Sequence, residues 1–131
     1  MRRGTWTGKI QVQYVEKGGR TEVFNAILDA GFELTALLWL GQSTEKFSQL
    51  VIEGAGAGDS VAKDITGSYT LATGSVTVTS TALFSSAEVS FDVETVALLG
   101  SGGTRIAEAS VAIPAGSAVE ITREDQLSEV V

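Results

Sequence analysis

Asp92 and Glu94 are the two carboxylates whose spacing comes closest to a catalytic pair, because residues two apart on a strand share a face. Such groups work as general acid and general base when their surroundings separate their pKa values. They can also join a calcium site, which needs about six to eight oxygen ligands. No apolar residue flanks the pair on its own face, and Asp59 with Asp64 lacks the spacing of an EF-hand loop. We therefore interpret Asp92 and Glu94 as solvated carboxylates on a strand.

A glycine-rich segment at Gly54–Gly58 is the second candidate for chemistry, since loops of this kind can hold phosphate groups. A Walker-type loop ends in Gly-Lys-Ser/Thr so that its lysine reaches the terminal phosphates, whereas Asp59 and Ser60 follow here. The glycine spacing of a dinucleotide-binding loop is also missing, and the Asp59 carboxylate would repel pyrophosphate. We interpret the segment as a flexible turn.

Histidine and cysteine are absent from the 131 residues. Their absence removes the commonest general base, the commonest transition-metal ligand and any thiolate. Together with the two failed motifs, this composition predicts a non-enzymatic protein with no catalytic residue, no metal and no cofactor.

The net charge of −7 is unevenly distributed along the chain. Residues 1–20 hold five basic and one acidic side chain, a sum of +4, and the remaining residues hold four basic and fifteen acidic ones, a sum of −11. Because an acidic body repels phosphate backbones, we expect no nucleic-acid partner. No apolar run reaches the roughly 18 residues of a membrane span. No signal-peptide core follows Met1-Arg2-Arg3, so we expect a soluble, unprocessed protein without a membrane partner.

The elements that must position these residues are mostly strands. Residues 86–113 alternate apolar and polar side chains on both sides of the Gly100–Gly103 turn, which predicts a half-buried antiparallel hairpin. A slip in the alternation predicts a β-bulge near Glu94-Thr95. A second hairpin is expected over residues 9–24, with its turn at Lys17-Gly18-Gly19. Further strands are expected at residues 49–53, 67–71, 75–84 and 119–122.

One segment has helical periodicity. Residues 26–40 place apolar side chains four apart, as in Leu28 and Phe32, and they lie between an N-cap candidate, Asn25, and a stop candidate, Gly41. The sequence therefore predicts one mainly β domain, an antiparallel β-sandwich of two packed sheets with one α-helix packed on it.

The two ends of the chain are expected to lie outside this domain, which spans residues 9–122. Residues 1–8 lack a clear period and are predicted to form an N-terminal arm, and the charged residues 123–131 are predicted to form a C-terminal tail. We expect partner binding through Arg2, Arg3 and Trp6 in the arm and through Glu124 and Asp125 in the tail. The alternatives are that Trp6 is an edge residue of the core and that both ends are simply frayed.

Five motifs follow one another in an order found in a known group of proteins. They are Gly4-Thr5-Trp6 before a hairpin, Asn25 with Gly31, the leucine-rich run Leu34 to Leu40, the run Ile52-Glu53-Gly54-Ala55-Gly56, and the hairpin from Glu94 to Ala109. In this order the chain resembles small bacteriophage virion proteins and tail- or head-fibre modules. The resemblance implies a jelly-roll-like or immunoglobulin-like sandwich in a virion that is assembled in the host cytoplasm. It carries over no catalytic or binding residues.

The expected function is that of a non-enzymatic structural protein of a bacteriophage virion. Within that class we expect a capsid cement or decoration protein, which binds and stabilises neighbouring subunits. Its expected partners are major capsid or tail proteins and further copies of itself, because symmetric contacts would cover the exposed edges of an isolated sandwich. The alternatives are a tail, collar, baseplate or fibre component, and a module that binds carbohydrate or a cell surface.

Overall fold

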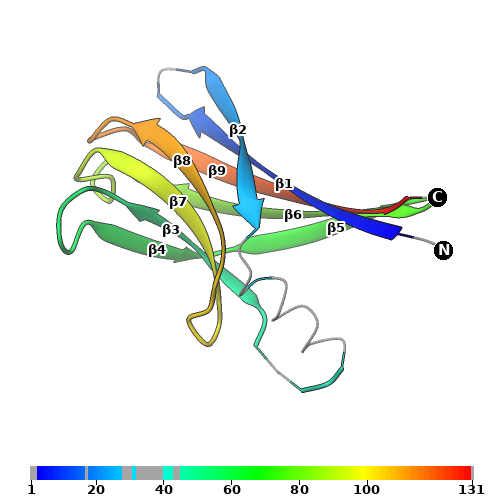
Figure 1. Cartoon of the computed structure of the whole chain (residues 1–131). Coiled ribbons are helices and arrows are strands. Elements are labelled where there is room, and N and C mark those ends of the chain that lie inside the picture. The colour runs from blue at the N-terminus through cyan, green and yellow to red at the C-terminus, as the bar shows by residue number, and fades with distance from the viewer. Residues whose placement is uncertain (1–2, 17, 28–30, 32–39, 43–44, 131) are drawn as a thin grey trace.

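The computed structural model describes residues 3–16, 18–27, 31, 40–42 and 45–130 (Figure 1). Strands account for nearly all regular structure in these residues, so the prediction of a mainly β protein is confirmed. The strands are β1 (Arg3–Tyr14), β2 (Arg20–Ile27), β3 (Phe47–Glu53), β4 (Ser60–Asp64), β5 (Thr66–Ala72), β6 (Ser75–Phe84), β7 (Val93–Gly100), β8 (Arg105–Ile113) and β9 (Val119–Val130).

All neighbouring strands are antiparallel and follow the order β4-β3-β7-β8-β2-β1-β9-β6-β5. β2 belongs to both halves of this order, because residues 20–25 pair with β1 whereas Ala26 and Ile27 pair with β8. Two sheets result, β5-β6-β9-β1-β2 and β4-β3-β7-β8, and they face each other as in a sandwich (Figure 1). β4 and β5 form the two ends of the order although only Ile65 separates them in sequence.

The core lies between the two sheets and is built from the inward side chains of alternating strand positions. The following are at most 1% exposed: Ile10, Val12, Leu50, Ile52, Phe84, Val96, Leu98, Ile106 and Ile121. Complete burial of one such side chain is worth about 1.5–3 kcal/mol relative to leaving it in water. This period-two burial explains why the alternating segments of the sequence form strands.

Two turns and one irregularity lie where the sequence predicts them. Gly18 and Gly19, in the β1–β2 turn, have φ values of 70° and 91°, which glycine adopts without strain. The β7–β8 hairpin turns at residues 100–103, where the Gly103 amide donates to the Gly100 carbonyl. The register of β7 against β8 shifts between Val93 and Thr95, where the bulge is predicted, but the extra residue belongs to β8, because one residue of β7 lies opposite Val111 and Ala112.

The predicted helix over residues 26–40 is not seen as an element in the described part of the chain, where Gly31 alone of this span has helical backbone. Its start is wrong, because residues 25–27 lie in β2, and Asn25 pairs with Gly8 in the β1–β2 ladder instead of capping a helix. Residues 28–30 and 32–39 lie outside the described residues. Ladder hydrogen bonds to β1 and β8 hold the start of the segment extended, and such tertiary pairing overrides a local helical pattern.

The segments expected to form an arm and a tail are strands. Residues 3–8 belong to β1 and residues 123–130 to β9, and these two strands pair along their whole common length. The apolar period is hidden because inward positions hold Gly8, Arg123 and Asp125. Backbone pairing continues across these positions without a hydrophobic side chain.

Residues 86–92 also differ from the prediction, because β7 begins only at Val93. The Ser85 amide donates to a Glu88 carboxylate oxygen at 3.0 Å, and the Glu88 amide donates to Ser85 Oγ at 3.2 Å. This reciprocal pair is a capping box, which bends the chain into a turn before the strand. β4, which no alternation in the sequence predicts, pairs with β3, and its Lys63 contacts Glu88 of this turn.

Candidate interaction surface

One end of the β5-β6-β9-β1 sheet continues beyond the core, and we name it the extension. It comprises residues 3–8, 69–78 and 125–130, which share a base because Asp125 lies opposite both Gly8 and Val78. The start of β1, the end of β9 and the turn between β5 and β6 lie at its far end (Figure 1). The extension therefore brings together three segments that lie far apart in the sequence.

Trp6, Arg123 and Asp125 fix the base of the extension. Arg123 is 0% exposed and Asp125 is 3% exposed. The Arg123 Nε donates to Asp125 Oδ2 at 2.7 Å, its second guanidinium contact is to Asp125 Oδ1, and Trp6 Nε1 donates to Oδ1 at 2.8 Å. A buried charge is tolerated when it is paired and hydrogen-bonded in this way. The Trp6 ring stacks on Phe47, with centroids 6.1 Å apart.

The five residues predicted to bind a partner are thus placed differently from one another. Trp6 and Asp125 contact each other inside the fold. Glu124 faces the opposite side of β9, 3.5 Å from Lys9 Nζ. Arg3 lies opposite Val130 in the β1–β9 ladder, and Arg2 lies outside the described residues. The partner binding of these five residues stays a prediction. The spacing of Arg123 and Asp125, two positions apart, is the sequence signal that both belong to a strand.

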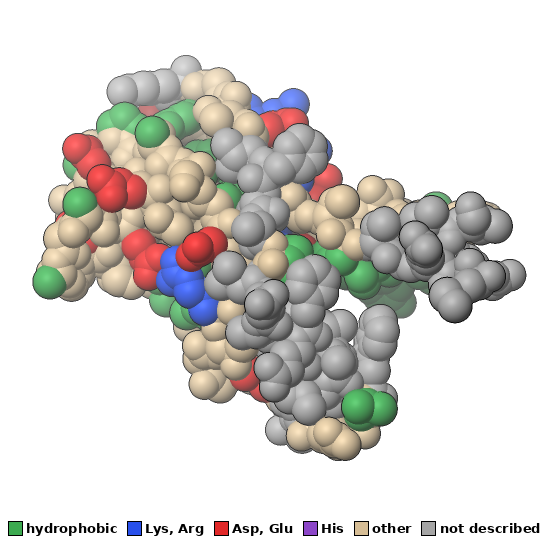
Figure 2. All heavy atoms as spheres, in the orientation of Figure 1, with side chains coloured by type: hydrophobic (Ala, Val, Ile, Leu, Met, Phe, Trp, Pro, Cys, Tyr) green, Lys and Arg blue, Asp and Glu red, His purple; other side chains and the backbone are tan. Residues whose placement is uncertain are grey.

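The inward face of the extension forms an open apolar groove. Its main lining side chains are Phe47, Ile65, Tyr69, Leu71, Val76 and Val78. Tyr69 is 70% exposed and Leu71 is 71% exposed, in contrast to the buried residues between the two sheets. In Figure 2 the described side chains at this projecting end are hydrophobic or uncharged. Exposed apolar patches of this kind mark surfaces that contact other molecules.

Charge is missing from the part of the sequence that forms this groove and its edge. Residues 65–87 contain no Asp, Glu, Lys or Arg, although the chain holds 25 such residues, nine basic and sixteen acidic. The opposite end of the strand order differs, because Lys63 of β4 pairs with Glu88 at 2.6 Å. Hydrogen bonds from Lys63 and from Ser85 lower the pKa of Glu88 from 4.5 to about 2.

A second ion-pair cluster joins β3 to β8. Arg105 donates two hydrogen bonds to the Glu53 carboxylate, at 3.0 and 2.6 Å, and one to Glu108 at 2.9 Å. The Arg105 hydrogen bond lowers the pKa of Glu53, and the pKa of Arg105 is raised by the same contact. The bidentate geometry links strands of one sheet.

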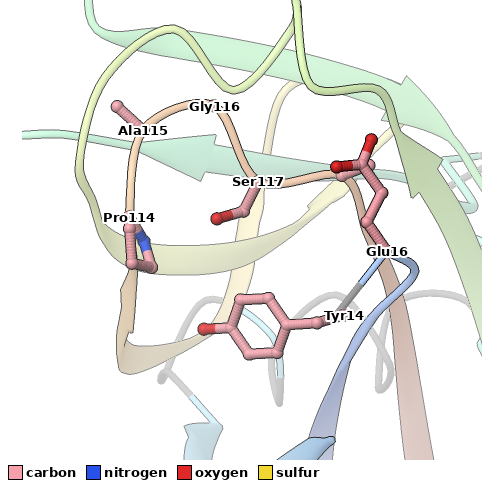
Figure 3. A pocket seen from close by; sticks show the side chains of 7 residues that line it. Tyr14, Glu16, Pro114, Ala115, Gly116 and Ser117 are labelled. Carbon is pink, nitrogen blue, oxygen red and sulfur yellow. The ribbon is translucent and has the colours of Figure 1, made fainter. Parts of the chain in front are cut away.

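A small pocket lies where the β8–β9 turn meets the end of β1 (Figure 3). It is lined by Tyr14, Glu16 and residues 114–118, and its volume of about 80 Å³ is well below the roughly 300 Å³ of typical ligand sites. The Tyr14 hydroxyl donates to the Ala112 carbonyl at 3.2 Å. Figure 3 shows the Glu16 carboxylate turned away from that hydroxyl. The two groups do not converge on a common point, so the pocket offers no acid–base pair.

The carboxylates singled out in the sequence hold turns. Asp92 accepts a hydrogen bond from the Ala115 amide at 2.9 Å. Asp59 accepts one from the Gly56 amide at 3.0 Å, and its carbonyl accepts another from Gly54, which closes the glycine-rich loop.

Among the described residues no three His, Cys, Asp or Glu side chains gather closely enough to hold a metal ion. No helix within the described ranges is long and apolar enough to cross a membrane.

No protein-family model, curated protein or solved structure matches this chain. The functional argument therefore depends on the groove, the extension and the edge of β5 that borders them.

Proposed function

We propose that this protein is a non-enzymatic structural subunit that stabilises a larger assembly by binding neighbouring subunits through its extension. The observation that carries the proposal is the uncharged, apolar groove, with Tyr69 and Leu71 mostly exposed on a molecule of net charge −7. When a neighbouring subunit covers this apolar surface, the surface leaves water, and the free energy of the system falls.

The assembly we propose is a bacteriophage virion, with the chain as a capsid cement or decoration protein. The resemblance of the sequence to small virion proteins supports this choice. Its partners are then major capsid or tail proteins together with further copies of the chain. Subunits of a symmetric assembly repeat the same contact surface at equivalent positions, and the extension is the surface that we propose for this contact.

The finer fold we propose is the jelly-roll-like form of the sandwich. Its support is the nested pairing of the strands: β1 pairs with β9, β2 with β8, and β3 with β7. Such nesting arises when a long antiparallel hairpin is rolled up as one unit, which is how jelly rolls are wound.

A carbohydrate-binding module is the less favoured alternative. Sugar sites combine an exposed aromatic ring with converging polar groups. Tyr69 supplies an exposed ring, but its described neighbours in the groove are chiefly Ile65, Leu71, Val76 and Val78. We therefore favour a protein surface as the occupant.

The composition of purified particles tests this function. Virions of the phage that encodes the chain are purified on a density gradient, and the chain is quantified against the major capsid protein by mass spectrometry. We expect many copies per particle in a fixed ratio to that protein. Absence of the chain from purified virions would contradict the proposal, and a few copies per particle would favour a tail or collar position over capsid decoration.

A further inference from the structure

β5 is an open sheet edge. In the described part of the structure it has one hydrogen-bonded neighbour, β6, and all seven of its residues are exposed. The sequence of Thr66–Ala72 contains no charge and no proline, and its register with β6 has no bulge. Charges, prolines and bulges are the devices that keep exposed edges from pairing. β5 has none of the three.

The outward backbone groups of β5 follow from its register. Ala72 lies opposite Ser75 across the Thr73-Gly74 turn, so these two form the hydrogen-bonded pair that closes the hairpin. Hydrogen-bonded and non-hydrogen-bonded pairs alternate along an antiparallel ladder. The amide and carbonyl groups of Gly67, Tyr69 and Leu71 therefore point away from β6, toward open space.

The other edge of the sandwich is protected. β4 has five residues against seven in β5, and it ends with Lys63 and Asp64. Lys63 is paired with Glu88, and Asp64 accepts a hydrogen bond from Gln49 Nε2 at 3.1 Å. Charged, short strands resist edge-to-edge pairing. Of the two end strands in the described strand order, β5 is thus the one without these protective features.

We propose that β5 pairs with β5 of a second copy of this chain, antiparallel about a two-fold axis at Tyr69. The proposal deepens the proposed function and rests on it, because it names the contact through which one subunit holds the next. The two Tyr69 residues lie opposite each other, and Gly67 of each copy lies opposite Leu71 of the other. All three outward residues of each strand then exchange hydrogen bonds with their opposite residue.

Charge and side-chain size select a second copy as the occupant. Two molecules of net charge −7 repel, and residues 65–87 are the long uncharged segment along which they can approach. An isologous contact needs a surface complementary to itself. Here Gly67, which has no side chain, gives room to Leu71 of the other copy. Directly opposite residues share a face, so the two apolar grooves join into one continuous surface.

The test compares Tyr69→Lys with Leu83→Lys. Tyr69 and Leu83 are 70% and 60% exposed, and they lie on neighbouring strands, but Leu83 faces away from the groove. Sedimentation equilibrium should show a dimer for the wild-type chain. Tyr69→Lys places like charges directly opposite each other and should weaken dimerisation about tenfold or more, whereas Leu83→Lys should leave it nearly unchanged. Melting curves confirm that both variants fold.

A cross-linking experiment tests the register. The chain has no cysteine, so Tyr69→Cys and Leu83→Cys each carry a single thiol. A short bismaleimide should convert Tyr69→Cys into covalent dimer and leave Leu83→Cys monomeric. The proposal is overturned if the wild-type chain stays monomeric at the highest soluble concentration, if Tyr69→Lys dimerises as well as the wild type, or if Leu83→Cys cross-links better. The proposed structural role is tested separately, by the composition of purified virions.

Discussion

Trp6, Arg123 and Asp125 show how three side chains set the base of the extension. Asp125 receives hydrogen bonds from both partners and is almost completely buried. The sequence points to Trp6 and Asp125 as candidates for partner binding. It could not show that the two side chains contact each other, since they lie 119 positions apart in the chain. Their contact depends on the β1–β9 register, which no local pattern encodes.

Replacing Asp125 with Ala should therefore destabilise the protein strongly. The change removes the buried carboxylate that accepts two hydrogen bonds from the Arg123 guanidinium, and breaking a buried ion pair costs about 3–5 kcal/mol of unfolding free energy. Urea denaturation followed by tryptophan fluorescence measures this loss. Glu124→Ala, on the opposite face of the same strand, is the control and should cost less than about 1 kcal/mol. Equal losses in the two variants would show that the buried pair has no special role.

Glu88 should make stability depend on pH. Its pKa in the folded protein is lowered from 4.5 to about 2 by Lys63 and Ser85. A lowered folded-state pKa stabilises the protein above the unfolded value, and this contribution is lost as the pH falls from about 4.5 toward 2. Glu88→Gln should thus be less stable than the wild type at pH 6, and the difference should shrink at pH 2.5. Glu94→Gln removes an exposed carboxylate and is the matched control. A constant difference across this range would contradict the assignment.

At the scale of elements, the strands with clean alternation could be predicted and those with charged or glycine positions could not. Residues 75–84 are predicted and observed as β6, whereas the continuation of β9 past Thr122 is hidden by its charged inward residues. The turn after Ser85 has a readable signal, Ser-x-x-Glu, that the alternation around it obscured. The edge position of β5 needs the complete strand order, which a sequence pattern does not contain.

The close packing of the β3–β4 turn leads to a glycine prediction. A Cβ atom at Gly54 would lie 2.7 Å from a Phe91 ring carbon and 2.9 Å from the Asp92 carbonyl oxygen. Gly54→Ala should therefore cost about 1–3 kcal/mol, as overpacked sites do. At Gly67 the nearest atom of the same molecule to such a Cβ is the Thr79 carbonyl oxygen, at 3.7 Å, so Gly67→Ala should leave the stability of the monomer unchanged or slightly raised when it is measured at a protein concentration too low for dimerisation. Thermal unfolding of both variants checks the contrast, and a tolerated Gly54→Ala would show that the loop can move aside.

At the scale of the whole molecule, the extension unites the two ends of the chain with the β5–β6 hairpin. Removing residues 1–7 should lower the melting temperature by more than about 5 °C, because the deletion takes away the β1–β9 ladder of the extension and the Trp6 contacts. Differential scanning calorimetry measures the shift. An unchanged melting temperature would mean that these residues are not part of the stable fold.

The most direct test of the proposed assembly role is a cryo-electron microscopy map of the virion in which we propose this chain to be a subunit. We expect each copy to have its extension covered, with the apolar groove and the β5 edge buried against a neighbouring subunit. A map in which every copy keeps β5 and the side chains of Tyr69 and Leu71 in solvent would contradict the account.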